Sequence, residues 1–374
     1  MSFSSFLVSL LALGAEAASD LALHARWVSD IHARSVQRRG DVGGSGLERT
    51  FAFPGFAGYV GSFDEETLEE IRANVNVTAV ELDAEVQLAS ALTSQANPPW
   101  GLSAISHANP PVSDSDYIYD SSAGEGTFSY VFDSGILLSH VEFEGRAELG
   151  IDATNGAVSD RTHGTHVAGI VGGRTYGVAK KTKIIDVQVT GSSLGQFSWL
   201  LAGIEWATLD IAAKNRTGKA VINASLATSS SEITNAAWKA VIDAGIPVVA
   251  AAGNSNQDAN DYSPANLPEA ITVAASNRLY RRWSASNWGT AIDLFAPGQD
   301  IPSAWTPGVT DVHVTSGTSM AAPYVAGVIA YLLALEGRRT PAEIKARVLE
   351  LATEGVIENL NGSPNVLLYN GNGA

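Results

Sequence analysis

The stretch "SGTSMAAPYVAGVIAYLLAL", residues 316–335, is apolar nearly all round and predicts a long buried helix. Gly317 frees the backbone before this helix, Ser319 stands where it begins, and Pro323 suits a first turn. A hydroxyl there lies beside backbone N–H groups and the positive end of the helix dipole, which stabilise an oxyanion. Ser319 is therefore a candidate nucleophile, with a simple helix cap as the alternative.

Upstream of this helix, short apolar runs alternate with helical segments. The runs are "TFSYVFD" (127–133), "KIIDVQV" (183–189), "AVINASL" (220–226), "IPVVAAAGN" (246–254) and "AITVAAS" (270–276). This alternation predicts an α/β fold with a parallel sheet buried on both faces. Ligands in such folds bind beyond the carboxyl ends of the strands, and those ends carry Asp133, Ser225 to Ala227 and Asn254.

A pair of histidines, in "RTHGTHVAGI" (161–170), begins another helical pattern. It suits a metal site, one catalytic base with a structural neighbour, or two core histidines. H-x-x-H lacks the glutamate and the further ligand spacing of familiar zinc motifs, which disfavours metal. If Asp133 and Ser319 share one crevice, His163 at the helix entrance lies nearest to them, and His166 is a packed core residue.

Asp133 and Asn254 each follow an apolar strand. A buried carboxylate at the first position is able to orient an imidazole, and a side-chain amide at the second is able to donate to a developing negative charge. The alternative for each is an ordinary turn residue at a strand end.

The composition excludes several classes of protein. The 374 residues carry a formal net charge of −16, which disfavours nucleic-acid and anionic-membrane surfaces. The absence of cysteine excludes disulfides, thiolate catalysis and cysteine-zinc sites. No segment is predicted to span a membrane.

The N-terminal region is predicted to hold a leader and a small domain. "SFLVSLLALGAEAASD" has an apolar core over 6–13 and an A-x-A-like site at 15–17, so residues 1–17 are predicted to be a signal peptide, with a buried or amphipathic helix start as the alternative. "FAGYVGSF" (56–63) and "VTAVELDAEV" (77–86) predict strands, and "DEETLEEIRANV" (64–75) predicts a helix. Residues 88–99 have the composition of a linker.

Five motifs in order resemble the subtilisin-like serine proteases, and the fungal proteinase K-like branch most closely. They are "YVFDSG" (130–135), "HGTHVAGIVGG" (163–173), "VINASL" (221–226), "VVAAAGN" (248–254) and "SGTSMAAPYVAG" (316–327). The resemblance covers about residues 97–372, with "SSLGQFSWLLAGIEWA" (192–207) and "RRWSASNWG" (281–289) among the matching segments between the motifs, and residues 50–87 resemble the inhibitory propeptide of that family.

The resemblance implies a three-layer sandwich with a mainly parallel, doubly wound sheet, preceded by a small α+β ferredoxin-like propeptide. The implied domains are a signal peptide (1–17), an inhibitor-like propeptide (18–92) and a peptidase domain (93–374). The implied product is a monomeric, secreted serine endopeptidase, made as a self-processing zymogen, with a broad specificity that favours apolar or aromatic residues before the cut. Its partners would be protein and peptide substrates and its own propeptide, with no nucleic acid and no membrane.

The resemblance also implies a role for particular residues. Asp133 would orient His163, His163 would take the proton of Ser319, and Asn254 with the Ser319 amide would form the oxyanion hole. The substrate backbone would lie between two edges, and a short segment would line the specificity pocket; these residues are Ser193, Leu194, Gly195, Ser225, Leu226, Ala227, Ala251, Ala252 and Gly253. Catalysis would need no cofactor.

A structural calcium ion is implied at the carbonyls of Pro268 and Ala270 and the carboxylate of Asp293, with a solvated turn residue as the alternative for Asp293. If the chain is secreted, Asn76 and Asn215 are glycosylation acceptors, unless their motifs occur by chance. Asn223 is discounted because its strand is predicted to be buried.

Three departures from the family pattern affect these expectations. Ser193 and Ala227 replace residues that are usually glycine, which puts the substrate range in doubt; Ala227 is predicted to favour leucine or alanine over phenylalanine. The propeptide is predicted to lack its first strand and therefore to inhibit weakly.

Self-cleavage is predicted near Leu92–Thr93. The alternatives in function are an inactive peptide-binding relative and an intracellular, vacuolar protease.

Overall fold

The computed structural model describes residues 4–10, 17–39, 46–53, 56–83, 92–109, 115–192 and 194–373. The chain divides into two compact units, residues 1–89 and 90–374. The predicted division after residue 92 therefore falls three positions later than the division of the structure. Each unit is described by itself below.

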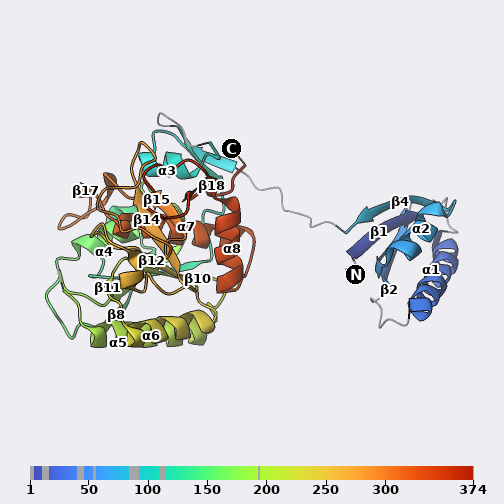
Figure 1. Ribbon diagram of the computed structural model, residues 1–374, viewed down its shortest axis with the longest axis horizontal. Helices are drawn as coiled ribbons and strands as arrows, with labels where there is room; N and C mark the ends of the chain where they lie inside the picture. The colour runs from blue at the N-terminus through green and yellow to red at the C-terminus, as the bar shows by residue number, and fades with distance from the viewer. Residues whose placement is uncertain are drawn as a thin grey trace. The chain divides into compact units, whose positions relative to one another are not determined.

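The N-terminal unit is a four-stranded antiparallel sheet covered by two helices (Figure 1). Its elements in chain order are β1 (Ser4–Leu10), α1 (Ala17–Arg39), β2 (Gly46–Phe53), β3 (Phe56–Phe63), α2 (Glu65–Ala73) and β4 (Val77–Leu82). The sheet order β2-β3-β1-β4 is the predicted ferredoxin-like topology. Its core lies between helices and sheet, where Val28 and Ile31 of α1 pack with Ile71 of α2 and Tyr59 of β3.

Strand β1 corrects one prediction about this unit and bears on another. Its backbone pairs with β3 from Ser4↔Phe63 to Leu10↔Ala57, and with β4 on its other side. The unit therefore has its first strand, so the expectation that this strand is missing is wrong, and the prediction of weak inhibition loses its basis. A cut after residue 17 would remove this central strand from the unit; the signal peptide over 1–17 stays a prediction. A short uncharged apolar run fits an h-region and a strand equally well, so the pattern alone does not distinguish them.

The second unit is built on a nine-stranded sheet with the order β18-β19-β15-β14-β12-β10-β7-β9-β8. All neighbours are parallel except the edge pair β18–β19. The strands are β7 (Phe128–Asp133), β8 (Ala147–Asp152), β9 (Lys183–Gln188), β10 (Ala220–Ala224), β12 (Val248–Ala251), β14 (Ile271–Ser276), β15 (Leu294–Pro297), β18 (Thr353–Glu354) and β19 (Val366–Leu367). Each of the five predicted strand runs is a strand of this sheet.

Helices and three two-stranded antiparallel sheets complete the described part of this unit. The helices are α3 (Trp100–Ile105), α4 (Thr162–Gly172), α5 (Phe197–Ala213), α6 (Glu232–Asp243), α7 (Thr318–Leu335) and α8 (Pro341–Leu351), with short 3₁₀ turns at Val141–Phe143 and Ala259–Asp261. The small sheets pair β5 (Leu92–Gln95) with β6 (Tyr117–Asp120), β11 (Thr228–Ser229) with β13 (Tyr262–Ser263), and β16 (Ile301–Ala304) with β17 (Val312–Thr315).

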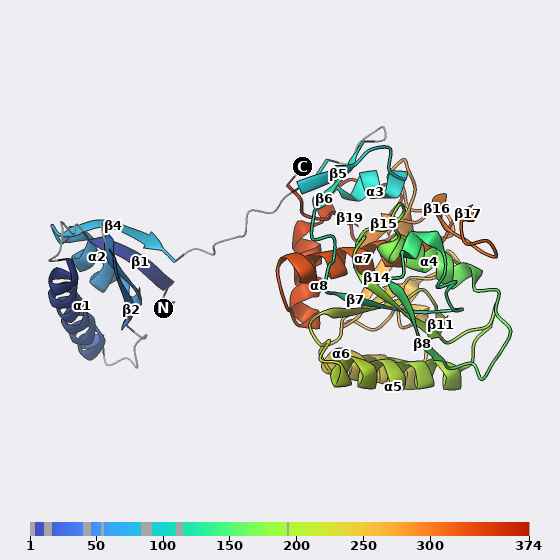
Figure 2. The ribbon, with the colours of Figure 1, turned by 180° about the vertical axis from the view of Figure 1, so that it is seen from behind.

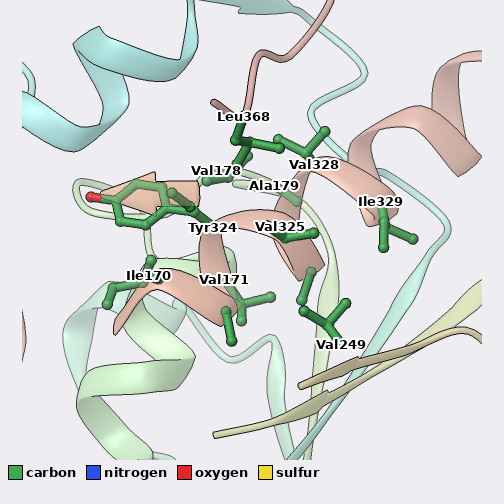
Figure 3. Close-up of a cluster of buried hydrophobic side chains, with 14 of the residues drawn as sticks. Ile170, Val171, Val178, Ala179, Val249, Tyr324, Val325, Val328, Ile329 and Leu368 are labelled. Carbon is green, nitrogen blue, oxygen red and sulfur yellow. The ribbon is translucent and has the colours of Figure 1, made fainter. Parts of the chain in front are cut away.

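Two hydrophobic clusters lie on opposite faces of the sheet. On one face, α5 and α6 cover a cluster that includes Phe132 and Trp238 (Figures 1 and 2). On the other face, α4 and α7 pack together; Figure 3 shows Val325 and Ile329 of α7 in one cluster with Val171 of α4 and Val249 of β12. This is the three-layer, doubly wound α/β fold that the sequence predicts.

Helix α7 is long and apolar enough to cross a membrane, contrary to the expectation that no segment would qualify. In the structure, however, 83% of that apolar window is buried inside the fold. The core of the peptidase unit therefore covers most of the apolar surface of α7, which is the central helix of one layer.

The chain order within the sheet places the functional groups. From β7 in the middle, the chain goes out to β8 and returns through β9, whereas β10 lies on the other side of β7. The carboxyl ends of β7 and β10 are thus at the point where the direction of winding reverses, which is where parallel sheets bind ligands. Asp133 and Ser225 lie there, since Ala224 pairs with Phe132.

Candidate active site

Asp133 and His163 form a hydrogen-bonded pair at the reversal point. Asp133 is the last residue of β7, and its side chain is 3% exposed. His163 lies in the first turn of α4 with a side chain 39% exposed. The Nδ1 atom of His163 lies 2.7 Å and 2.8 Å from the two carboxylate oxygens of Asp133, and the backbone N–H of Ser134 also donates to Asp133 at 2.7 Å. Since Nδ1 carries the proton given to Asp133, the Nε2 atom of His163 is left as the basic nitrogen.

The close approach of α4 to β7 depends on Gly164. A Cβ at this position would lie 2.3 Å from the carbonyl oxygen of Gly135 and 3.1 Å from the Cβ of Asp133. Any side chain would therefore push the helix and His163 away from Asp133. The glycine between the two histidines thus has a specific function, to let the imidazole reach the carboxylate.

The pKa of His163 is raised above its ordinary value of 6.5. Burial alone would lower this pKa, but the negative charge of Asp133, its hydrogen bond, and the charge of Asp160 together outweigh the burial. The imidazolium is therefore favoured by its surroundings, as a base that must accept a proton during a reaction requires.

His166 is buried and bonded elsewhere. Its Nε2 donates to the carbonyl oxygens of Ile301 at 3.0 Å and His313 at 3.2 Å, and Trp305 packs edge-on against its ring. Burial lowers the pKa of His166 to about 4, so the ring stays neutral at ordinary pH. The two histidines therefore bind different partners, and His166 has the structural environment that the sequence predicts.

Ser319 lies in the first turn of α7 and touches the end of β10. Its hydroxyl donates to the carbonyl oxygen of Ser225 at 3.3 Å, while the hydroxyl of Ser225 donates to the carbonyl oxygen of Ser319 at 2.8 Å. Ser225 follows the strand that neighbours Asp133. These two hydrogen bonds thus join the first turn of α7 to the end of β10, the strand next to the one that carries Asp133.

Asn254 is oriented by the residue before Ser319. Its Oδ1 accepts hydrogen bonds from the backbone N and the hydroxyl of Thr318, at 2.8 Å and 2.9 Å. A Cβ built on Gly317 would lie 3.5 Å from the Nδ2 of Asn254 and 3.6 Å from the backbone N of Ser319. Both nitrogens therefore border the same space, which a glycine at position 317 leaves open. Gly317 itself is extended, with φ 165°, so its value here is the missing side chain rather than backbone freedom.

A buried amide supports the loop that carries Asn254. Asn287 donates from Nδ2 to the carbonyl oxygen of Ala252 at 2.9 Å, and its Oδ1 accepts from the backbone N–H groups of Ser255 and Gln257, both at 3.0 Å. Gly253 has φ 102°, and a Cβ there would lie 2.4 Å from the Nδ2 of Asn287. Hydrogen bonds of Asn287 thus fix the turn that follows β12 and carries Asn254.

The predicted substrate edges differ in their environment. Along one edge the exposure increases with residue number: Ser225 is buried, Leu226 is half-buried and Ala227 is exposed. This segment therefore runs from the core to the solvent. On the other edge, Leu194 is 82% exposed and Gly195 bridges back to Thr190, whereas Ser193 lies outside the described residues. The predicted pocket residues Ala251 and Ala252 end β12 and follow it, and both are buried.

The expected calcium position contains a side chain of the protein itself. The ammonium group of Lys345 donates to the carbonyl oxygens of Pro268 at 2.8 Å and Ala270 at 2.7 Å, and to the carboxylate of Asp293 at 2.8 Å. Asp293 is therefore not a solvated turn residue either. Since a cation already bonds all three groups, this donor set does not fit a calcium ion. Among the described residues, no cluster of three His, Cys, Asp or Glu side chains is placed to hold a metal.

The predicted glycosylation acceptors lie at the surface. Asn76 is exposed in the turn before β4, and Asn215 is exposed after α5, with φ 52°. Asn223 is fully buried in β10 and donates to the hydroxyl of Ser225 at 2.9 Å, in agreement with its exclusion. The structure thus leaves Asn76 and Asn215 as the accessible acceptors of the three.

Sequence reasoning missed the supporting residues of the site. Thr318, Asn287 and the hydroxyl of Ser225 fix the positions of Asn254 and Ser319, as described above. A further buried carboxyl, Asp186 on β9, accepts from the backbone N–H of Ile136 at 3.0 Å, and burial raises its pKa to about 7. Thr318 and Asn287 lie within the quoted motifs "SGTSMAAPYVAG" and "RRWSASNWG", which were a signal for them; Asp186 had none.

Comparison with known proteins identifies the family of this chain. The sequence pattern described as "Subtilase family" matches residues 124–373, and that of "Peptidase inhibitor I9" matches residues 7–89. Alkaline protease 1 of Aspergillus clavatus is 48% identical over 352 residues, covering 93% of this chain and 87% of the relative. The alkaline proteinase of Hapsidospora chrysogena is 47% identical over 370 residues, covering 96% of this chain and 90% of the relative.

A solved structure gives the same result for the fold. The crystal structure of a cold adapted subtilisin-like serine proteinase superposes with a TM-score of 0.69 at 38% sequence identity. The match covers 74% of this chain and 99% of that one. The inhibitor pattern, which starts at residue 7, also includes part of β1, consistent with that strand belonging to the N-terminal unit.

Proposed function

The chain belongs to the subtilase family of serine peptidases and carries an inhibitor propeptide, and from this premise we propose that Asp133, His163 and Ser319 are its catalytic triad. The observation that supports this most strongly is the bond from Nδ1 of His163 to both oxygens of Asp133. That bond selects the tautomer whose Nε2 is able to take a proton. The proposed activity is endopeptidase cleavage of protein substrates.

The proposed reaction uses groups of this chain alone. The Ser319 oxygen attacks the carbonyl carbon of the peptide bond while His163 takes the hydroxyl proton at Nε2. The Nδ2 of Asn254 and the backbone N–H of Ser319, which border the same space, donate to the oxyanion that forms. His163 then gives its proton to the leaving amine, and a water molecule hydrolyses the acyl-enzyme by the same steps. Asp133 stabilises the imidazolium throughout.

We infer a broad substrate range with a preference for apolar residues before the cut. Its support is that the predicted pocket residues Ala251 and Ala252 are apolar and buried, and that the predicted edge residue Leu194 is exposed, as contact with an extended substrate requires. The exposed methyl of Ala227 narrows this range toward leucine or alanine, because a Cβ takes space that a large aromatic side chain would use.

We also propose that the chain cuts itself between its two units. The predicted position, Leu92–Thr93, lies within β5, whose residues pair with β6 from Leu92↔Asp120 to Gln95↔Tyr117. A cut there would split a strand of the peptidase unit. The units divide between Ala89 and Ser90, so we place the cut before β5, within residues 84–91.

The test of this function is a Ser319→Ala chain, compared with wild type for peptide cleavage, labelling by a serine-directed fluorophosphonate and release of the N-terminal unit. We expect loss of all three, with turnover lower by about 10⁶-fold, the size known for the nucleophile of subtilisin. The fold should be intact, as judged by circular dichroism. Cleavage between the units in the Ser319→Ala chain, expressed without other proteases, would contradict self-processing. If the fluorophosphonate labels wild type but not the Ser319→Ala chain, that result also argues against an inactive peptide-binding relative.

We propose that the enzyme acts outside the cell. A protease that is made with its own inhibitor is able to pass through a cell without digesting it, and the propeptide supports this use. The test is to detect the mature chain in culture supernatant; retention in a vacuolar fraction would favour the intracellular alternative. Glycans on Asn76 or Asn215, measured by mass spectrometry, would add independent support.

A further inference from the structure

Lys345 is a cation enclosed by oxygen atoms at the amino ends of two strands. It lies on α8, and its ammonium bonds the carbonyls of Pro268 and Ala270, just before β14, and the carboxylate of Asp293, just before β15. The side chains of Lys345 and Asp293 are only 19% and 20% exposed. An ammonium has three N–H donors, and here each has an oxygen acceptor at 2.7–2.8 Å.

These oxygen atoms suit an ammonium rather than a calcium ion. Calcium takes about six to eight oxygen ligands at roughly 2.3–2.6 Å. The protein offers two carbonyls and one carboxylate here, and the carboxylate also accepts from the backbone N–H of Thr272 at 2.8 Å. A calcium ion beside Lys345 would add two positive charges next to an ammonium with one carboxylate to balance them. The two cations therefore exclude each other.

The surroundings hold Lys345 in this position. Ile344 and Val348, on the same helix, are fully buried in the core that α8 shares with α7. The helix begins with a capping box, in which Thr340 and Glu343 bond each other's backbone N–H groups. The backbone of α8 is thus fixed by its own contacts, and the lysine extends from a fixed helix to the two strands.

We propose that Lys345 is a built-in cation that replaces a structural metal ion, so that the junction of α8, β14 and β15 is held without calcium. Burial raises the pKa of Asp293, and the charge and hydrogen bond of Lys345 oppose this rise. Removal of the ammonium leaves a partly buried carboxylate and two carbonyls without their donor, which costs stability.

The experiment measures the melting temperature of the full chain in excess calcium and in excess chelator. All variants carry Ser319→Ala, which prevents self-digestion. The variants are Lys345→Met, which keeps the length of the side chain, Asp293→Asn, and the matched control Lys183→Met, whose lysine pairs with Glu148 at 2.8 Å with side chains 52% and 44% exposed.

We expect Lys345→Met to lower the melting temperature of the peptidase unit by about 4 °C in chelator, against less than about 1 °C for Lys183→Met. Any rise caused by calcium should be equal in the reference chain and in Asp293→Asn, because no calcium is bound at Asp293. A calcium-dependent rise in the reference chain that disappears in Asp293→Asn would overturn the proposal. So would equal effects of the two lysine substitutions. If Lys345→Met does not fold, the comparison of the reference chain with Asp293→Asn decides the question.

Discussion

Asp133 and Asp293 each pair with a basic side chain, but at opposite ends of the same sheet. Asp133 lies at the carboxyl end of β7 with a partner, His163, that is 39% exposed; Asp293 lies before the amino end of β15 with a partner, Lys345, that is 19% exposed. His163 uses one ring nitrogen for the pair and keeps the other for a proton. Lys345 uses all its donors on the protein.

The difference shows what would separate the proposed reactive pair from the proposed structural one. Both pairs contain a carboxylate and a nitrogen base at hydrogen-bond distance, so the pairing itself does not assign a role. His163 keeps one ring nitrogen unused in the pair and has a pKa raised above 6.5, whereas all three N–H donors of Lys345 are bonded to the protein. Substitutions at each end should therefore separate activity from stability.

The largest expected contrast comes from the same substitution in both pairs. Asp133→Asn should lower kcat by about 10⁴-fold, because an amide stabilises neither the imidazolium nor the required tautomer. Asp293→Asn should leave kcat within about twofold and lower the melting temperature by a few degrees, since it weakens the bond to Lys345. Steady-state kinetics and calorimetry on both variants check this. Loss of turnover in Asp293→Asn with an unchanged melting temperature would abolish the distinction.

The next effect concerns the oxyanion donors at the reactive end. Asn254→Leu should lower kcat by about 10²–10³-fold with little change in KM, because the amide bond strengthens only as negative charge develops. Its Oδ1 also orients the turn through Thr318, so the melting temperature is measured on the same sample. A change confined to KM would place Asn254 in substrate binding instead.

The pH dependence of activity should report the protonation of His163. His163 must be neutral to act, so kcat/KM should rise about tenfold per pH unit up to its pKa, which the Asp133 and Asp160 charges hold above 6.5. The stability from protonated His163 has the opposite sign: it is present below pH 6.5 and lost as the pH rises through the raised pKa. In Asp133→Asn, the acid limb of the residual activity should move to lower pH. A limb that stays in place would mean that another group controls it.

The smallest expected effect is on substrate choice. Ala227→Gly should raise the kcat/KM ratio of phenylalanine over leucine before the cut by roughly threefold to tenfold, because the removed methyl frees space at an exposed edge of the cleft. The control is Ala244→Gly, a change at the end of α6, remote from the sheet's reactive end. A peptide-library profile that is identical in wild type and Ala227→Gly would show that the methyl points away from the substrate.

Sequence patterns determined the fold of the peptidase unit and the residues of the proposed triad. Alternating apolar runs predicted β7, β9, β10, β12 and β14, and all five are present. Asp133, Asn254 and Ser319 were singled out because strand ends and helix starts are local features, which a few neighbouring residues specify. The choice of His163 over His166 rested on their positions along one helix and on the expectation that Asp133 and Ser319 share one crevice. The family resemblance, which comparison bears out, strengthened these inferences.

Only the tertiary structure decided the roles of residues whose partners are distant in sequence. The run at 4–10 fits a leader and a strand equally until β3 and β4, some fifty and seventy residues later, bond both its edges. Lys345 reaches Asp293 across 52 positions, and no local pattern predicts that an ammonium would stand where a metal ion was expected. The physical reason is common to both cases: a local pattern reports which conformation a segment prefers, while an ion pair or a strand edge depends on which segments the completed fold brings together.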